Sequence, residues 1–205
     1  MRCIDLTRSF GATAPVFPGD PPAILERIAT IKEHGYTSHR IAASVHTGTH
    51  IDAPAHMLEG GKLLSDIGVE RYFGRGVLVD ARGMTTVTAT ALKNVELRRG
   101  DIVLVLTGWS AQYGSQRYFS DYPEISPSFA QRLADAQVSL VGMDTPGPDR
   151  PHYLVHKLLL SHNVLIIENL LHLEELLQTK EFEVAALPAH WEADAAPVRV
   201  VARIP

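Results

Sequence analysis

The chain alternates short apolar runs with polar or proline-rich connections, a pattern that predicts a mixed α/β protein with many short strands. Four valine-rich runs predict strands that are buried on both faces, at residues 76–80, 101–109, 138–144 and 164–169. Alternating or β-branched stretches predict further strands at residues 3–8, twice within 23–45, and at 182–188 and 197–204.

Helices are expected in only a few places. Ser126 and Pro127 predict a helix start, because serine is a favoured N-cap and proline suits the first helical turn. Further helices are predicted at 87–94, 153–160 and 170–178, the last capped by Asn169. The segment 14–22 is too rich in proline for a helix or a central strand, and predicts a rigid loop that carries Phe17.

The composition favours one domain, over residues 1–205, because 45% hydrophobic residues suffice for one core and no linker divides the chain. The net charge of −4 is spread evenly, which argues against a nucleic-acid partner. The chain contains no run of 18 apolar residues, which argues against a membrane span or a membrane partner. The first residues lack the apolar core of a signal peptide. With a single cysteine, which excludes an internal disulfide, the chain is expected in the cytoplasm.

The segment 44–56 concentrates potential metal ligands. It contains His46, His50, Asp52 and His56, whereas the whole chain of 205 residues has only 10 histidines. The offsets between these four residues are all even, so in an extended chain their side chains point to one face. Four such groups held close together need solvent or a cation, because buried unpaired polar groups cost a few kcal/mol each.

Two more positions attract attention on chemical grounds. Glu168 ends a strongly apolar strand, where a carboxylate needs a cation or hydrogen bonds to compensate its burial. Trp109 follows another such strand and suits either core packing or a pocket wall. Five other histidines have no carboxylate at ligand spacing or no defensible match and are expected to be structural or solvated, namely His34, His39, His152, His162 and His172.

The run from 46 to 56 reads His-x-Gly-Thr-His-x-Asp-x-Pro-x-His, and in this it resembles the cyclase-like metal-dependent hydrolases, the family of bacterial kynurenine formamidase and isatin hydrolase. The resemblance implies a swivelling β/β/α barrel-like core and a homodimer or homotetramer. It also implies a histidine twelve positions before a strand-end glutamate, which His156 and Glu168 match, and substrate contacts at Phe17 and Trp109. Lys157 departs from the family, which often has a second histidine there.

The implied metal ligands are His46, His50, Asp52, His156 and Glu168. Nitrogen and oxygen donors without a thiolate favour Zn²⁺, with Mn²⁺ as the alternative. Five ligands exceed the need of one tetrahedral ion that also binds water, so two ions bridged by a carboxylate, or one ion of higher coordination, would use them all. The resemblance to the formamidases implies two ions, bridged by Asp52 or Glu168. A bound divalent cation lowers the pKa of water to about 7. His56 lies on the same face outside the five ligands and is expected to be catalytic, as a proton shuttle.

The predicted activity is therefore hydrolysis of a carbon–nitrogen bond in a small-molecule amide by metal-activated water. Arylformamidase activity, which converts N-formylkynurenine to kynurenine and formate, is the first expectation. Phe17 stands where kynurenine formamidases usually have tryptophan, so another cyclic amide, an isatin-like ring or a lactone is the alternative substrate. A non-catalytic metal-binding protein is the alternative of a different class.

Overall fold

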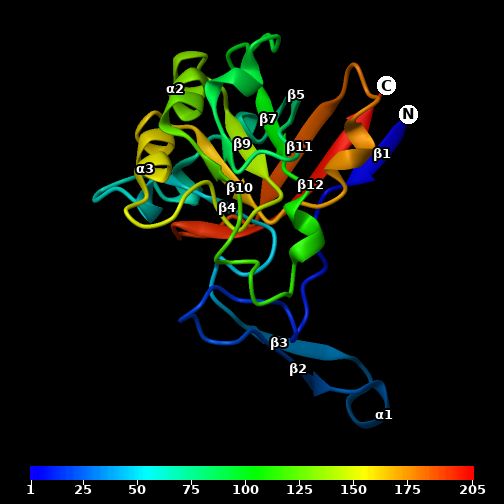
Figure 1. The fold of residues 1–205 in the computed structure, drawn as a ribbon. Coiled ribbons are helices and arrows are strands. Elements are labelled where there is room, and N and C mark those ends of the chain that lie inside the picture. The colour runs from blue at the N-terminus through cyan, green and yellow to red at the C-terminus, as the bar shows by residue number, and fades with distance from the viewer.

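A closed barrel of seven strands forms the centre of the structure, a computed structural model that describes residues 1–205 (Figure 1). Around the barrel the order is β12 (Ala195–Ile204), β11 (Glu183–Pro188), β5 (Phe73–Asp80), β7 (Ile102–Leu106), β9 (Leu140–Met143), β10 (Leu165–Glu168) and β4 (His50–Asp52). The pairing of β4 with residues 195–197 of β12 closes the ring, and β1 (Arg2–Asp5) pairs with residues 201–204 of β12. The predicted mixed α/β fold with a barrel-like core is confirmed.

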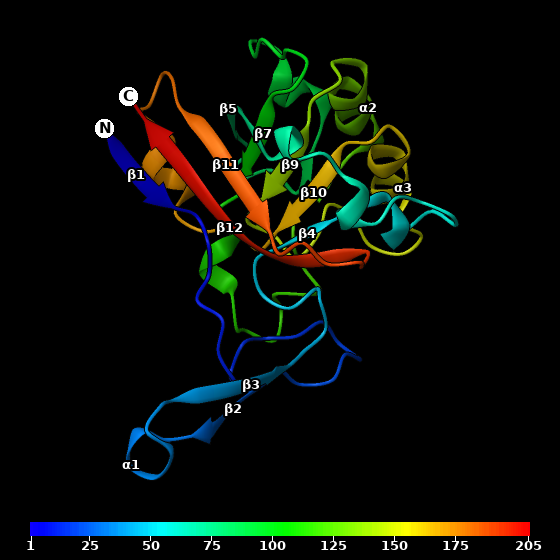
Figure 2. The ribbon, with the colours of Figure 1, turned by 180° about the vertical axis from the view of Figure 1, so that it is seen from behind.

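The four strands β5, β7, β9 and β10 run parallel, and their apolar residues divide between two cores. Successive side chains of a strand point to opposite faces. On β7, Leu104 and Leu106 face the barrel interior, whereas Val103 and Val105 face the layer outside it. That outer layer contains α2 (Pro127–Asp135) and α3 (Leu154–Ser161), which lie side by side against the barrel (Figure 2).

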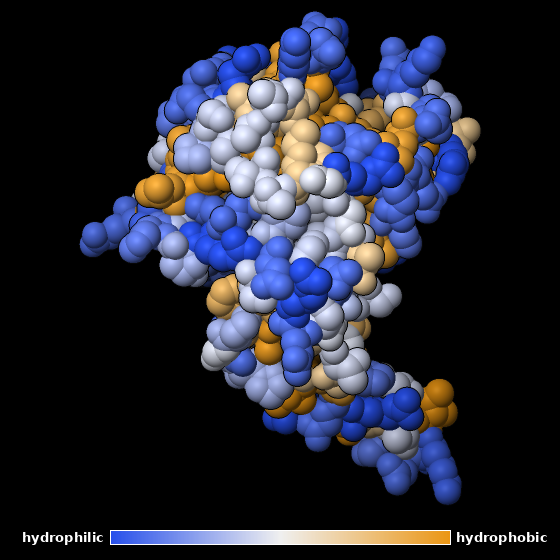
Figure 3. Space-filling view, viewed as in Figure 1, coloured by the Kyte–Doolittle hydropathy of each residue, from blue (hydrophilic) through white to orange (hydrophobic).

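The β2–β3 hairpin stands apart from the barrel. It comprises β2 (Ile24–Ala29), the short helix α1 (Ile31–His34) and β3 (Ser38–Ala42), and we call residues 24–42 the hairpin arm. The arm extends away from the barrel in both ribbon views (Figures 1 and 2). Its exposed large side chains are Ile24, Ile28, Ile31, Tyr36 and Ile41. Hydrophobic patches interrupt the hydrophilic surface of the arm (Figure 3).

The predicted helices differ in outcome. Both α2 and α3 are confirmed, and Ser126 caps α2 by accepting a hydrogen bond from the backbone N–H of Phe129. The helix predicted at 87–94 is a short 3-10 helix, Ala89–Leu92, and two small strands, β6 (Thr86–Val87) and β8 (Glu124–Ile125), were not predicted. No helix is both long and apolar enough to span a membrane.

The helix predicted at 170–178 is wrong, because only the 3-10 helix Leu173–Leu176 forms there. Asn169 does not cap it. The Asn169 side chain instead donates to the Gly48 carbonyl oxygen and accepts from the Tyr118 hydroxyl, and its backbone adopts a left-handed φ of 60°. Asn169 therefore ties the end of β10 to the segment that contains the histidines. The first predicted strand is also shorter than expected, since β1 ends at Asp5.

Candidate metal centre

The histidine-rich segment converges on one place by three local structures rather than by one strand. Only His50 and Asp52 lie on a strand, β4, where their separation by two positions puts them on one face. Gly48 has a left-handed φ of 73°, and the turn around it places His46 beside them. His56 lies on the 3-10 helix Pro54–His56. The extended chain assumed for the whole segment is therefore present only in β4, although the side chains converge as predicted.

Strand pairing brings the second half of the site to the first. In the antiparallel pair of β4 and β10, His50 lies opposite Glu168. His50 Nε2 is 3.3 Å from Glu168 Oε2 and 3.3 Å from Asp52 Oδ1. His46 Nδ1 lies 3.1 Å from Asp52 Oδ1, and His156 Nε2, from α3, lies 3.3 Å from Glu168 Oε1. The structure thus places all five predicted ligands together.

Two of the histidines are oriented by hydrogen bonds on the ring nitrogen that points away from Asp52 and Glu168. Nδ1 of His50 donates to the Gly48 carbonyl oxygen at 3.0 Å, and Nδ1 of His156 donates to Asp149 at 2.6 Å. Each neutral ring then keeps its lone pair on Nε2, toward the other donor atoms, as metal-binding histidines commonly do. Asp149 also accepts from the backbone N–H of Val155, so one carboxylate starts α3 and orients its histidine.

The buried donor atoms fit a divalent cation. His50 and Asp52 are 1% and 0% exposed, yet His50 Nε2 and both carboxylate oxygens of Asp52 make no hydrogen bond. Unpaired buried polar atoms are costly, and a cation among them would satisfy all three. Nitrogen and oxygen donors without sulfur suit Zn²⁺ or Mn²⁺. The residues at this site therefore suit a bound divalent cation.

Asp52 belongs to two groups of potential ligands. One group contains His50, Asp52 and Glu168, which are all buried, and the other contains His46, Asp52 and His56. Within each group the donor atoms lie within 4.8 Å of one another. His56, which was predicted outside the ligand set, thus lies close enough to join it. This arrangement could hold one ion or two, with Asp52 common to both.

Electrostatics favour positive charge in the site. Burial lowers the pKa of the His46 imidazole, but contact with the Asp52 carboxylate and its negative charge outweigh burial and raise that pKa to about 9. Burial likewise opposes protonation of His156, and hydrogen bonds to Asp149 and Glu168 raise its pKa to about 10. Burial raises the pKa of Asp52, but the adjacent imidazoles hold it well below its usual range. The carboxylates therefore favour either protonated rings or a bound cation.

Asp194 was not predicted as a site residue, although it begins a stretch, 194–199, that resembles the family. Its Oδ2 lies 3.1 Å from His46 Nε2 and 3.2 Å from His56 Nδ1. The two imidazole rings lie against each other, with centroids 4.2 Å apart. Asp149 was missed as well, and its only signal in the sequence is its place shortly before a predicted helix, where acidic caps are common.

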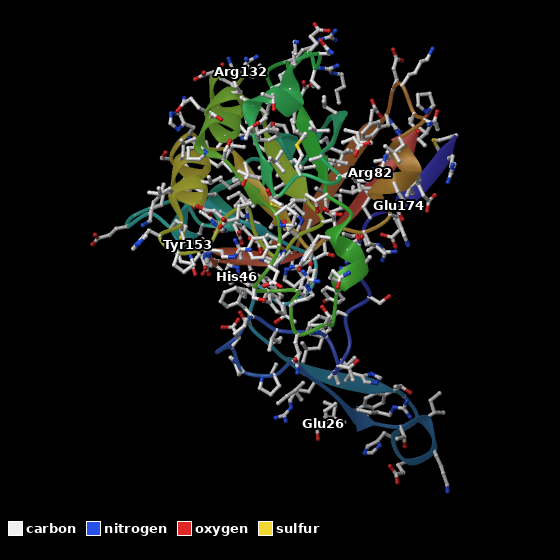
Figure 4. All side chains as sticks on the ribbon, viewed as in Figure 1. Glu26, His46, Arg82, Arg132, Tyr153 and Glu174 are labelled. Atoms are coloured by element: carbon white, nitrogen blue, oxygen red, sulfur yellow. The ribbon has the colours of Figure 1, made fainter.

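A cavity of about 260 Å³ opens onto the donor atoms, and its lining includes His46, His56, His156 and Glu168. Its apolar and aromatic wall comprises Phe17, Met57, Phe119, Tyr122, Pro146 and Tyr153. Phe17, which comes from the proline-rich loop, meets Phe119 edge to face at a centroid distance of 5.7 Å. His46 and Tyr153 are labelled near each other in Figure 4. Phe17 is therefore placed where substrate contact was expected.

Trp109, the other predicted substrate contact, does not line this cavity. Its indole N–H donates to the Tyr118 carbonyl oxygen at 3.0 Å, and the Tyr118 ring packs edge to face against Phe119. Trp109 therefore reaches the aromatic wall only through Tyr118, which packs against Phe119. Lys157 is exposed and donates to the His152 carbonyl oxygen. The histidines expected to be solvated are all exposed, namely His34, His39, His152, His162 and His172.

Comparison with known proteins gives the family. A model described as "Putative cyclase" matches residues 4–150. Kynurenine formamidase of Bacillus cytotoxicus is 30% identical over 206 residues, which cover 98% of this chain and 96% of that protein. A solved structure described as a potential metal-dependent hydrolase with cyclase activity has a TM-score of 0.81 and 31% identity, covering 100% of this chain and 99% of the other. The fold and donor set are those of a metal-dependent hydrolase, and the chain belongs to the cyclase family.

A second solved structure supports the fold alone. Isatin hydrolase A from Labrenzia aggregata, bound to benzyl benzoate, has a TM-score of 0.88 at 23% identity. The match covers 99% of this chain and 93% of the other. The barrel and its outer helices are thus shared across relatives of low sequence identity.

Proposed function

We propose that this protein is an arylformamidase that hydrolyses N-formylkynurenine to kynurenine and formate. The class of enzyme is a metal-dependent hydrolase of carbon–nitrogen bonds other than peptide bonds, in line with its kynurenine formamidase relatives. The observation that carries the proposal is the cluster of buried nitrogen and oxygen donors at the end of a cavity with aromatic walls. The donor cluster suits hydrolysis, and the aromatic walls suit an aryl group.

The cation supplies a Lewis acid and lowers the pKa of water at the site when it is bound. We propose Zn²⁺ as this cation, held by His46, His50, Asp52, His156 and Glu168, with Mn²⁺ as the alternative. Because Asp52 belongs to both donor groups, the residues present would suit two ions as well as one.

His56 is proposed to transfer the proton. Its side chain lines the cavity and is about one quarter exposed, so a substrate can reach it. In the hydrolysis, the water oxygen adds to the formyl carbon and the carbon–nitrogen bond breaks. An imidazole can take the proton of that water and return it to the departing amine nitrogen. The products are formate and an arylamine.

The aromatic wall supports an aryl amide as substrate. Phe17, Phe119 and Tyr153 surround a cavity that also contains His56 and Glu168, so an aryl ring against the wall leaves its amide near the donor atoms. Aromatic pairs prefer edge-to-face or offset geometries, and the edge-to-face pair of Phe17 and Phe119 already shows one side of such a cage.

We also propose a cytoplasmic homodimer. The exposed aliphatic side chains of the hairpin arm support self-association, because a two-stranded hairpin without other packing is only marginally stable. A second copy of the chain would supply a matching apolar surface. Dimers with twofold symmetry are also the commonest homo-oligomers. The single exposed Cys3 suits a reducing compartment.

Steady-state turnover tests the proposed function. We expect purified protein loaded with Zn²⁺ or Mn²⁺ to hydrolyse N-formylkynurenine, and His56→Ala to lose about 100- to 10,000-fold in kcat while it keeps its metal. The exposed His162→Ala is the matched control and should retain activity. A panel of formanilide, isatin and an aryl lactone separates the substrate classes. Failure of the wild type on the whole panel with metal bound contradicts the enzyme, and loss of metal from His56→Ala contradicts the role of His56.

A further inference from the structure

We infer that Asp194 is a positioning residue that fixes the tautomers of His46 and His56 together. This inference rests on the proposed function, in which His46 is a ligand and His56 transfers a proton. One oxygen, Oδ2, makes both contacts, at 3.1 Å to His46 Nε2 and 3.2 Å to His56 Nδ1. Asp194 directly precedes β12, far in sequence from both histidines.

The chemistry of a carboxylate determines the tautomers. An ionised carboxylate only accepts hydrogen bonds, so each ring nitrogen that faces Asp194 must carry the hydrogen. A neutral His46 then has its lone pair on Nδ1, the atom 3.1 Å from Asp52 Oδ1 and therefore on the side of the other donors. A neutral His56 has its lone pair on Nε2, the nitrogen that is free to accept a proton.

His46 is thereby the exception among the ligand histidines. His50 and His156 both donate through Nδ1 and keep Nε2 for the donor group, whereas His46 donates through Nε2. Each ring orientation requires its own hydrogen-bond acceptor beyond the ligands. Gly48 and Asp149 serve the first two rings, and Asp194 serves the third.

The backbone holds Asp194 where this role requires. Its carbonyl oxygen accepts a hydrogen bond from the backbone N–H of Ala53 at 2.8 Å, and Ala195 pairs directly with Asp52 between β12 and β4. The same strand pair that contains Asp52 therefore positions Asp194. Asp194 is also the only side-chain hydrogen-bond partner of His56, and it does not line the cavity.

Asp194 contacts His56 but lies outside the cavity lining, so its replacement should change the rate and leave substrate binding nearly unchanged. Asn at position 194 offers a neutral amide oxygen in place of the charged Oδ2, so both hydrogen bonds from the imidazoles lose their charge assistance. Replacement of a hydrogen-bond partner of a metal-binding histidine typically lowers metal affinity or activity by 10- to 100-fold. We expect Asp194→Asn to lower kcat by about 10- to 100-fold, with KM changed by less than about twofold because residue 194 is outside the cavity lining.

The experiment compares zinc-loaded wild type with Asp194→Asn, Asp194→Ala and Asp194→Glu. Each protein is measured for kcat, KM and zinc content, and the exposed Glu192→Gln is the matched control. Imidazole ¹⁵N NMR of the wild type should show His56 with its hydrogen on Nδ1, and Asp194→Asn should show a mixture of tautomers. Glu keeps the carboxylate, so Asp194→Glu should recover part of kcat and of the wild-type NMR pattern.

An unchanged His56 tautomer in Asp194→Asn and Asp194→Ala, or a kcat within twofold of wild type in both, would overturn the inference. Some loss of zinc is expected in either variant, because Asp194 also orients the ligand His46. The NMR measurement needs no substrate. It therefore decides the role of Asp194 even if the wild type hydrolyses nothing in the panel, and that outcome would remove only the proposed function.

Discussion

At the scale of single residues, the site depends on histidine rings whose outer nitrogens are fixed by hydrogen bonds. The rings of His50 and His156 are fixed by acceptors on their outer nitrogens, so their lone pairs point toward the carboxylates before any ligand arrives. Groups that are fixed in advance lose little entropy on binding a cation. The exposed histidines elsewhere in the chain have no such carboxylate pair around them.

Phe119 offers a test of the aromatic wall. Its ring packs edge to face on Phe17 and lines the cavity, so Phe119→Ala should weaken aryl binding. An aromatic pair is worth about 0.5 to 1.5 kcal/mol beyond its buried area, which corresponds to a rise in KM of about 2- to 13-fold. Steady-state kinetics on an aryl formamide check this, with Phe73→Ala, a half-exposed residue of β5, as control. An unchanged KM would argue against aryl contact at this wall.

The sequence predicted the inner residues of the site better than the outer ones. His46, His50 and Asp52 share one short segment, so their spacing alone predicted convergence, and the apolar run before Glu168 marked its carboxylate as unusual. Asp149 and Asp194 reach the histidines only after the chain has folded, 7 and more than 130 positions away. Spacing within a segment contains no information about such contacts.

At the scale of elements, short irregular structures do much of the positioning. β4 has three residues, and the segments on either side of it supply His46 and His56. The Pro54–His56 helix is held by the turn that follows it, where the backbone N–H of Ala55 donates to the Lys62 carbonyl oxygen at 3.0 Å. The turn and the helix thus behave as one unit beside the site.

Gly61 makes that contact possible and gives a prediction for this unit. A Cβ at position 61 would lie 2.5 Å from the Pro54 carbonyl carbon, closer than real contacts allow. Gly61→Ala should therefore displace the helix that contains His56 and lower kcat at least tenfold, since small misplacements of catalytic groups are costly. Gly11→Ala, where a Cβ would meet nothing within 4 Å, is the control. Equal kcat in both variants would show that this helix position does not matter.

Local signals predicted the regular elements where the residues agreed with the tertiary structure. Serine and proline marked the start of α2, and valine-rich runs marked the parallel strands. The apolar stretch after Asn169 misled the prediction of a helix over 170–178, because Leu170, Leu173 and Leu176 pack into the barrel core with only the short 3-10 helix Leu173–Leu176. Tertiary packing thus overrode a helical pattern.

At the scale of the whole molecule, barrel closure joins the two halves of the site. β4 pairs with β10 on one side and β12 on the other, which brings residues 46–56 against Glu168 and Asp194. Hydrophobic periodicity could not predict this closure, because pairing partners distant in sequence leave no local pattern. The barrel was predicted only through the resemblance to a family.

The hairpin arm yields a prediction about assembly. We expect the wild type to sediment as a dimer, and the double variant Ile31→Asp/Ile41→Asp to sediment as a monomer, because charged groups would replace exposed aliphatic ones. Analytical ultracentrifugation at micromolar concentration measures the outcome, and Lys32→Asp changes charge in the arm without removing apolar surface. A monomeric wild type, or a dimeric double variant, would contradict assembly through the arm.

The metal content of protein purified without added metal tests the central claim most directly. Elemental analysis should find at least one equivalent of zinc or manganese per chain in the wild type and in His162→Ala. Asp52→Asn should retain little of it, because Asp52 is common to both donor groups. A wild type that binds neither ion on dialysis, or full metal content in Asp52→Asn, would contradict the assignment of this cluster as a metal centre.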